Sequence, residues 1–351
     1  MDGPAAEDPR AVSGIAQVAR GAGRGSRTGC VLAALATGVA ALFALTLVCG
    51  QGCAPVPEVL AALLGRDVPG TSFLVQDLRL PRALLSLVTG LSFGLGGVAF
   101  QLMLRNPLAS PDIIGISAGA GTAAVFAIVV LSLDGPVVSL FAVVSGLGVA
   151  GAIWGLSSGR SAAGARFILV GIGIAAMLDS ATSYMLLDAQ AWDRAEAMRW
   201  LTGSMNGART EHVWPVAAAL IGFGGLLASR ARDLEILRLG DDMAAGLGVR
   251  PDLTRLRVTL AAVGLVAFAT AAAGPVAFVA FLAGPIAARL TRGRARLPAA
   301  AAMGAILVLG GDFAGQFLLP VRLPVGVVTG ALGAPFLLYL ITRANRAGGA
   351  L

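Results

Sequence analysis

The ionisable side chains of this 351-residue chain are few, and their types exclude most enzymatic chemistry. All 26 basic residues are arginine, so no lysine is available for a phosphate-binding loop or a Schiff base. The single histidine, His212, follows Glu211 at a predicted helix start, where a solvated interface residue is the simpler interpretation. The sequence shows no catalytic triad pattern, paired-carboxylate motif or metal-ligand spacing. We therefore expect no catalytic residue, no metal site and no cofactor bound by this chain.

Two further groups could carry chemistry, a cysteine pair and one acidic residue. Cys49 and Cys53 lie near the end of the first apolar run, and Cys30 lies at its start. The pair either forms an external disulfide or consists of small residues at a helix end, and the sequence favours the second. Asp179 is the acidic residue that we place inside an apolar segment, where a carboxylate is costly and faces a cavity or a partner. It either bonds to a neighbouring helix, which we favour, or lines a translocation path.

The composition indicates the elements that must position these residues. The chain is 57% hydrophobic and only 13% charged, against about 25% charged residues in soluble domains. A soluble protein this apolar would expose large patches and aggregate, so we predict an all-α, polytopic membrane protein. A span needs about 20 apolar residues. The sequence then predicts ten transmembrane helices, at 30–50, 82–104, 113–133, 137–157, 167–187, 213–229, 256–273, 275–289, 299–318 and 325–342.

The arginine distribution predicts the orientation. With ten spans and both termini in the cytoplasm, most arginines fall in cytoplasmic segments, as the positive-inside rule requires. Merging the spans on either side of Gly274-Pro275 would move the cluster from Arg289 to Arg296 outside. We therefore predict a membrane domain over 30–342. A disordered cytoplasmic tail over 1–29 would precede it, and a cytoplasmic tail over 343–351 would follow.

Two loops have features of their own. The external segment 188–212 contains Trp192 and Trp200, is amphipathic, and is expected to lie along the outer surface. The cytoplasmic segment 230–257 is predicted to form short helices that stand off the membrane. Asp241 or Asp242 would cap the first of these and Gly246 or Gly248 would end it, and Asp252, after Pro251, would cap the next. From the residues alone, a docking element and a solvated connection remain equally good interpretations.

The segment Leu78–Gly121 joins two apolar runs and is rich in small residues, which let helix backbones approach closely in lipid. The predicted topology places Arg79 and Arg82 at its outer end and Arg105 at its inner end. Arg322, in a turn between two prolines, also lies outside. Each external arginine either anchors a helix end or presents charge to an acidic soluble partner.

The sequence contains several short motifs whose combined order and spacing are specific to one family of proteins. They are Arg79-Leu80-Pro81-Arg82, Gln101, Arg105-Asn106-Pro107-Leu108-Ala109, Pro111, Gly115, Leu239-Gly240-Asp241-Asp242, Leu247-Gly248-Val249, Ala273-Gly274-Pro275-Val276-Ala277-Phe278, Leu323–Thr329 and Gly333-Ala334-Pro335. On these residues the chain resembles the permease subunits of bacterial ABC importers for iron–siderophores, haem and vitamin B12, and within them the ferric-siderophore permeases.

The resemblance implies a type II ABC importer permease fold in the cytoplasmic membrane. It implies pairing with a second permease subunit, with a heterodimer favoured over a homodimer. Two cytoplasmic ATPase subunits would bind ATP and magnesium, and an extracytoplasmic binding protein would deliver the substrate. A ferric siderophore is the preferred substrate, with cobalamin or haem as the alternative. A secondary transporter that uses Asp179 for ion coupling is the competing class.

The resemblance also assigns residues. It implies binding-protein docking by Arg79 and Arg82, with Arg322 replacing a family arginine that would fall near Gln316. Pathway or packing candidates are Gln101, Asn106, Pro107, Asp179, Gly274 and Pro275. The implied ATPase-coupling residues are Leu239, Gly240, Asp241, Asp242, Ala244, Ala245, Leu247 and Gly248. The chain departs from the family at Gly284-Pro285, since the usual Pro-His step is absent, and no role is transferred for that histidine.

Overall fold

The computed structural model describes residues 9–50, 52–112, 115–157, 163–291 and 297–346. Its regular elements there are all helical. They are α1 (Pro9–Val48), α2 (Val56–Leu63), α3 (Thr71–Phe73), η1 (Leu74–Arg79), α4 (Leu80–Leu104), α5 (Ile116–Val125), η2 (Phe126–Val130), α6 (Gly135–Ser157), α7 (Ala163–Leu187), α8 (Ala191–Leu201), α9 (Thr210–Ser229), α10 (Ala231–Leu237), α11 (Asp241–Gly246), α12 (Pro251–Ala273), α13 (Val279–Leu290), α14 (Leu297–Phe313), η3 (Ala314–Leu318) and α15 (Val325–Arg346). The three η elements are π-helical turns that continue α3, α5 and α14.

Each of the ten predicted spans contains a helix, which confirms the all-α membrane class. Among the described residues, seven helices are long and apolar enough to cross a membrane. Three further apolar helices are shorter, at Ile116–Val130, Val279–Leu290 and Val325–Leu340. The count of ten complete spans therefore stays a prediction.

The helices do not end where the predicted tails begin. Helix α1 begins at Pro9, within the predicted tail 1–29, and residues 1–8 lie outside the described residues. The division into tails and membrane domain stays a prediction. Helix α15 continues to Arg346, into the predicted C-terminal tail, and residues 347–351 lie outside the description. The arginine-rich turns at 158–162 and 292–296 also lie outside it.

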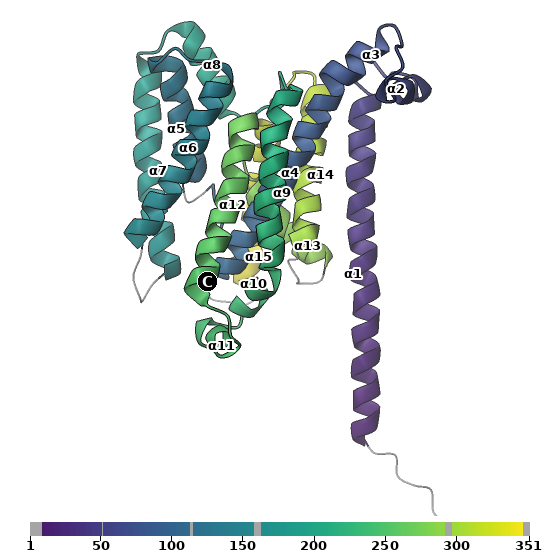
Figure 1. Cartoon of the computed structure of the whole chain (residues 1–351). Coiled ribbons are helices and arrows are strands. Elements are labelled where there is room, and N and C mark those ends of the chain that lie inside the picture. Colours follow the sequence, from purple (N-terminus) through teal and green to yellow (C-terminus); the bar gives the residue numbers. More distant parts are fainter. Residues whose placement is uncertain (1–8, 51, 113–114, 158–162, 292–296, 347–351) are drawn as a thin grey trace, which may run out of the picture.

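The helices form a bundle with its connections at two ends (Figure 1). Elements α2, α3 and α8 lie at the upper end in that view, and α10 and α11 lie at the lower end, where α1 also begins. This arrangement agrees with the alternation of loops that the arginine pattern predicts. Helix α4 is central in the bundle. In the candidate span Thr71–Leu104, which contains α4, 78% of the 18-residue apolar stretch is buried inside the chain, against 17% in the spans of α1 and α7.

Glycines on α4 bring it into backbone contact with its neighbours. A Cβ on Gly90 would lie 2.6 Å from the Cα of Ala305 in α14, and one on Gly94 would meet the carbonyl oxygen of Ala300. Gly97 approaches the backbone of Ala280 in α13 in the same way. The small residues that mark this segment are therefore packing residues, as lipid-embedded helices require because they gain little from apolar burial.

The α4–α14 contact predicts a large effect of Gly94→Leu. The new side chain would meet main-chain atoms that cannot move aside, so we expect a loss of stability above the roughly 1–3 kcal/mol usual for overpacking. The measurement is thermal unfolding and yield of the assembled transporter in detergent. Gly173→Leu on α7 is the matched control, since a Cβ at Gly173 meets no atom within 4 Å. Equal stability of the two variants would contradict the close contact.

Candidate coupling and translocation site

The lower end of the bundle carries two short helices, α10 and α11, formed by the predicted cytoplasmic loop. Gly240, with a φ of 110°, is the residue before α11, a conformation that glycine adopts without strain. The prediction that Asp241 or Asp242 caps this helix is wrong, because both lie inside its first turn. The helix ends at Gly246, as predicted, and Gly248 has a φ of 84°. Likewise Arg250, and not Asp252, precedes α12.

Asp241 instead joins three helices. Its Oδ1 accepts hydrogen bonds from Arg105 Nη2 at 2.7 Å and from Arg255 Nη2 at 2.8 Å. Arg105 follows the end of α4 and Arg255 lies in the second turn of α12. The carboxylate therefore ties α11 to two helices of the membrane domain. Sequence reasoning did not identify Arg255, since nothing in the local pattern relates it to Asp241.

The apolar residues of this element divide between two faces. Leu237, Ala244 and Val249 are buried together and fix α11 on α10. Leu239, Met243 and Leu247 are 61%, 59% and 58% exposed. Three large apolar side chains exposed on so small an element form a surface suited to a protein partner. The docking role of this element stays a prediction.

The end of α4 is shaped by hydrogen bonds that hold the predicted pathway residues. Arg105 adopts a left-handed conformation with a φ of 53°, and the Asn106 N–H bonds to the Gln101 carbonyl at 3.1 Å, which ends the helix. Asn106 Oδ1 accepts from the Leu108 N–H at 2.9 Å and fixes the following turn. Gln101 Nε2 donates to the Phe281 carbonyl of α13 at 3.0 Å.

These residues border a cavity of about 360 Å³ at the same end of the bundle. It is lined by Gln101, Leu102, Arg105, Asn106, Pro107, Arg238, Gly284, Pro285 and Ala288. At Gly284 the chain differs from the family motif, and the glycine fits the local packing because a Cβ at this position would collide with Gln101 Oε1. Three of the pathway candidates, Gln101, Asn106 and Pro107, are therefore brought together with Arg238, which follows α10.

Asp112, in the connection to α5, was missed by sequence reasoning. The Ser117 hydroxyl donates to Asp112 Oδ1 at 2.6 Å, and Ser110 lies 3.4 Å from Oδ2. Burial raises the pKa of Asp112, and the hydrogen bonds from both serines oppose that rise. The sequence signal for this contact was an acidic residue placed five positions before a serine at the start of a predicted helix. The carboxylate therefore connects Ser110 to Ser117 in the first turn of α5.

At the opposite end, Arg79 has a structural role that its sequence position did not reveal. Its side chain is buried, and its guanidinium donates to the carbonyls of Leu47, Val48 and Gly52 at 2.9, 2.6 and 2.9 Å. The first two carbonyls belong to the last turn of α1, which lacks helical N–H partners. The structure therefore gives Arg79 a structural role at the end of α1, and its contact with a binding protein stays a prediction.

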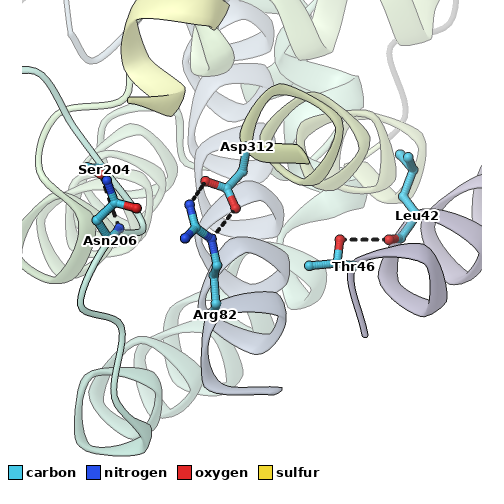
Figure 2. A network of polar contacts seen from close by, with 6 residues as sticks. All are labelled: Leu42, Thr46, Arg82, Ser204, Asn206 and Asp312. Atoms are coloured by element: carbon cyan, nitrogen blue, oxygen red, sulfur yellow. Dashed lines mark hydrogen bonds and ion pairs between the residues drawn. The ribbon is translucent and has the colours of Figure 1, made fainter. Parts of the chain in front are cut away.

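Arg82 is paired within the chain. Its Nε and Nη2 each lie 2.7 Å from a carboxylate oxygen of Asp312 on α14, and Figure 2 shows the two planar groups facing each other. The Asp312 side chain is 3% exposed and that of Arg82 is 19% exposed. Asp312 lies within the predicted span 299–318, so Asp179 is not alone among acidic residues in the spans, which the sequence analysis overlooked. The sequence signal for this ion pair was the presence of one arginine and one aspartate in two separate apolar segments.

The other candidates lie apart from the cavity. Asp179 is exposed on α7, and within the described residues it has no ion-pair partner. Gly274 and Pro275 lie at a backbone junction, where Ser204 N donates to the Ala273 carbonyl at 2.7 Å and Gly203 packs on Pro275. Arg322 is exposed after η3.

The chain is similar to known transport permeases over most of its length. The ferric enterobactin transport system permease protein FepG of Escherichia coli (strain K12) is 37% identical over 295 residues, covering 82% of this chain and 88% of that protein. The achromobactin transport system permease protein CbrC of Dickeya dadantii (strain 3937) is 37% identical over 291 residues, covering 82% and 83%. A solved inward-facing metal-chelate type ABC transporter superposes with a TM-score of 0.80 at 23% identity, over 90% of this chain and 99% of that chain.

The helical bundle, its two-helix element at one end and these similarities define an integral membrane permease of the ABC importer class. Residues 38–343 match the FecCD transport family, and the chain belongs to that family.

Proposed function

We propose that this chain is a permease subunit that moves a ferric siderophore across the bacterial cytoplasmic membrane by ATP-driven alternating access. The permeases named above serve ferric enterobactin and achromobactin transport, which favours a siderophore over cobalamin or haem. The observation that carries the proposal is the α10–α11 element, with its exposed apolar side chains and its ionic connection to α4 and α12. Asp179 has no partner in the described part of the chain that would favour an ion-coupled mechanism.

We propose a partner for each end of the bundle. Two ATPase subunits bind ATP and magnesium, and one docks on the surface of Leu239, Met243 and Leu247. A second permease subunit completes the pathway, with a heterodimer favoured, and both termini lie in the cytoplasm. An extracytoplasmic binding protein docks at the opposite end, where Arg322 is exposed. This chain itself binds no nucleotide, metal or cofactor.

The proposed coupling runs through Asp241. Movement of α11 by a closing ATPase is passed by the Asp241–Arg105 contact to the end of α4. That end carries Gln101 and Asn106, which border the cavity. Because packed helices move as rigid bodies, a displacement at α11 alters the opening that these residues surround.

The test is reconstitution of the complete transporter. Proteoliposomes that contain this chain, the second permease and the ATPase are expected to accumulate radiolabelled ferric siderophore when ATP and the loaded binding protein are supplied. Vesicles without the ATPase, and vesicles given labelled cobalamin or haem, are the controls. Accumulation without the ATPase would contradict the ABC mechanism, and accumulation of cobalamin or haem alone would contradict the siderophore assignment.

A further inference from the structure

Cys49 and Cys53 face each other across a short antiparallel bridge at the end of α1. Gly50 N donates to the Gly52 carbonyl at 3.2 Å, and Ala54 N donates to the Val48 carbonyl at 2.9 Å. These two bonds flank the cysteines without involving their own main-chain groups. Cys49 and Cys53 are therefore a non-hydrogen-bonded pair, the type in which facing side chains are closest and Cα atoms lie about 4.5 Å apart.

That spacing suits a covalent link. Disulfides join residues whose Cα atoms are roughly 4.4–6.8 Å apart, so a bond requires no movement of the backbone. The bridge places Cys49 directly opposite Cys53, on the same short turn. Cys30, near the other end of α1 and exposed, has no such neighbour in the described chain.

The surrounding structure holds the pair in place. The guanidinium of Arg79 binds the carbonyls of Val48 and Gly52, which are the residues next to Cys49 and Cys53. A Cβ on Gly50 would lie 2.6 Å from Arg79 Nη2, so the turn is closed directly over this group. A buried cation thus fixes both sides of the turn before any bond between the sulfurs exists.

We propose that Cys49 and Cys53 form an intramolecular disulfide that closes this turn around Arg79. The inference rests on the topology of the proposed function, which places the turn in the extracytoplasmic compartment, where disulfides persist. The oxidant is a disulfide, either of a dithiol–disulfide oxidoreductase or of a small molecule.

The exchange proceeds in two balanced steps. The thiolate of Cys53, the more exposed of the two, attacks one sulfur of the oxidant, forming a mixed disulfide and expelling one thiolate. Cys49, after loss of its proton to solvent, attacks the Cys53 sulfur and expels the second thiolate. Two thiols of this chain become one disulfide, and the oxidant disulfide becomes two thiols that take up the two protons.

The experiment counts oxidised cysteines in the full chain expressed in intact cells. Cells are quenched in acid, free thiols are blocked with N-ethylmaleimide, and the protein is then reduced and labelled with a polyethylene-glycol maleimide that shifts its mobility. We expect the wild type and Cys30→Ser to gain two labels, and Cys49→Ser and Cys53→Ser to gain none. Cys30 is the internal control, because it should be blocked in the first step.

Two results would overturn the inference. A wild type that gains no label has reduced cysteines, and a wild type that migrates as a dimer without reductant has intermolecular bonds. Iron uptake by the same cells is measured in parallel, so a failure of the siderophore assignment appears in uptake while the label count still reports on the cysteines.

Discussion

Asp241→Arg is expected to reduce ATP-driven siderophore uptake at least tenfold, to the level of vesicles without this chain, while ATP hydrolysis by the complex continues. In the wild type one carboxylate oxygen binds Arg105 and Arg255 at 2.7 and 2.8 Å. An arginine in its place would put three cations together and separate α11 from α4 and α12. The measurement is the ratio of siderophore transported to phosphate released in proteoliposomes.

The fold should survive this change. The Asp241 and Arg105 side chains are each 42% exposed, and ion pairs so exposed contribute only about 0–1 kcal/mol to stability. A loss of uptake would therefore reflect the broken contact between α11 and the helices α4 and α12, and not unfolding. Circular dichroism and the melting temperature of the purified complex can verify that the fold is intact. Asp241→Asn, which retains an acceptor oxygen, should keep part of the uptake.

Asp242→Arg is the matched control for this experiment. Asp242 occupies the same first turn of α11, so the two substitutions change the charge near the helix N-terminus equally. Within the described residues, however, Asp242 has no ion-pair partner. If Asp241→Arg transports normally, the coupling assignment is wrong. If both variants lose uptake equally, the charge of the turn matters and the link to Arg105 and Arg255 does not.

Arg82→Ala is the second change with a large expected effect, in this case on stability. It would leave the carboxylate of Asp312, which is 3% exposed, without its bidentate partner. Breaking one side of a buried pair costs about 3–5 kcal/mol, because the remaining charge is neither solvated nor neutralised. We expect a lower melting temperature and a lower yield of assembled transporter.

A double variant tests whether the stability lost in Arg82→Ala comes from the unpaired charge of Asp312. Arg82→Met combined with Asp312→Leu replaces both charges by apolar groups of similar size, a change that is often neutral or stabilising. We expect this double variant to recover most of the stability lost in Arg82→Ala. Equal stability of Arg82→Ala and the wild type would show that the pair is not needed. Charge reversal at Arg82 would break this internal pair, so that variant cannot by itself test docking of the binding protein.

The sequence was sufficient to predict the helices, but it did not predict the contacts between residues that lie far apart along the chain. Apolar length located a helix in each predicted span, and the arginine pattern placed 188–212 and 230–257 at opposite ends of the bundle. The close approach predicted from the small residues of Leu78–Gly121 is confirmed at Gly90 and Gly94. Capping was predicted wrongly at Asp241, because this residue lies inside the first turn of α11, and its carboxylate binds two arginines from distant parts of the chain.

The amino-acid sequence by itself determined the membrane class, the helical segments and the motifs of the FecCD family. These depend on properties that are local or periodic along the chain, such as a run of apolar residues, a proline or a charged loop. Only the tertiary structure decided that Arg79 is buried beneath the end of α1, that Arg82 pairs with Asp312, and that Asp241 joins α11 to α4 and α12. The partners of these charges are 31, 230 and 136 residues away along the chain. Their interactions depend on helix packing, which brings each charge to a distant partner: backbone carbonyls for Arg79, a buried carboxylate for Arg82, and a half-exposed ion pair for Asp241. For Arg79 and Asp312 these partners offset the cost of burying a charge.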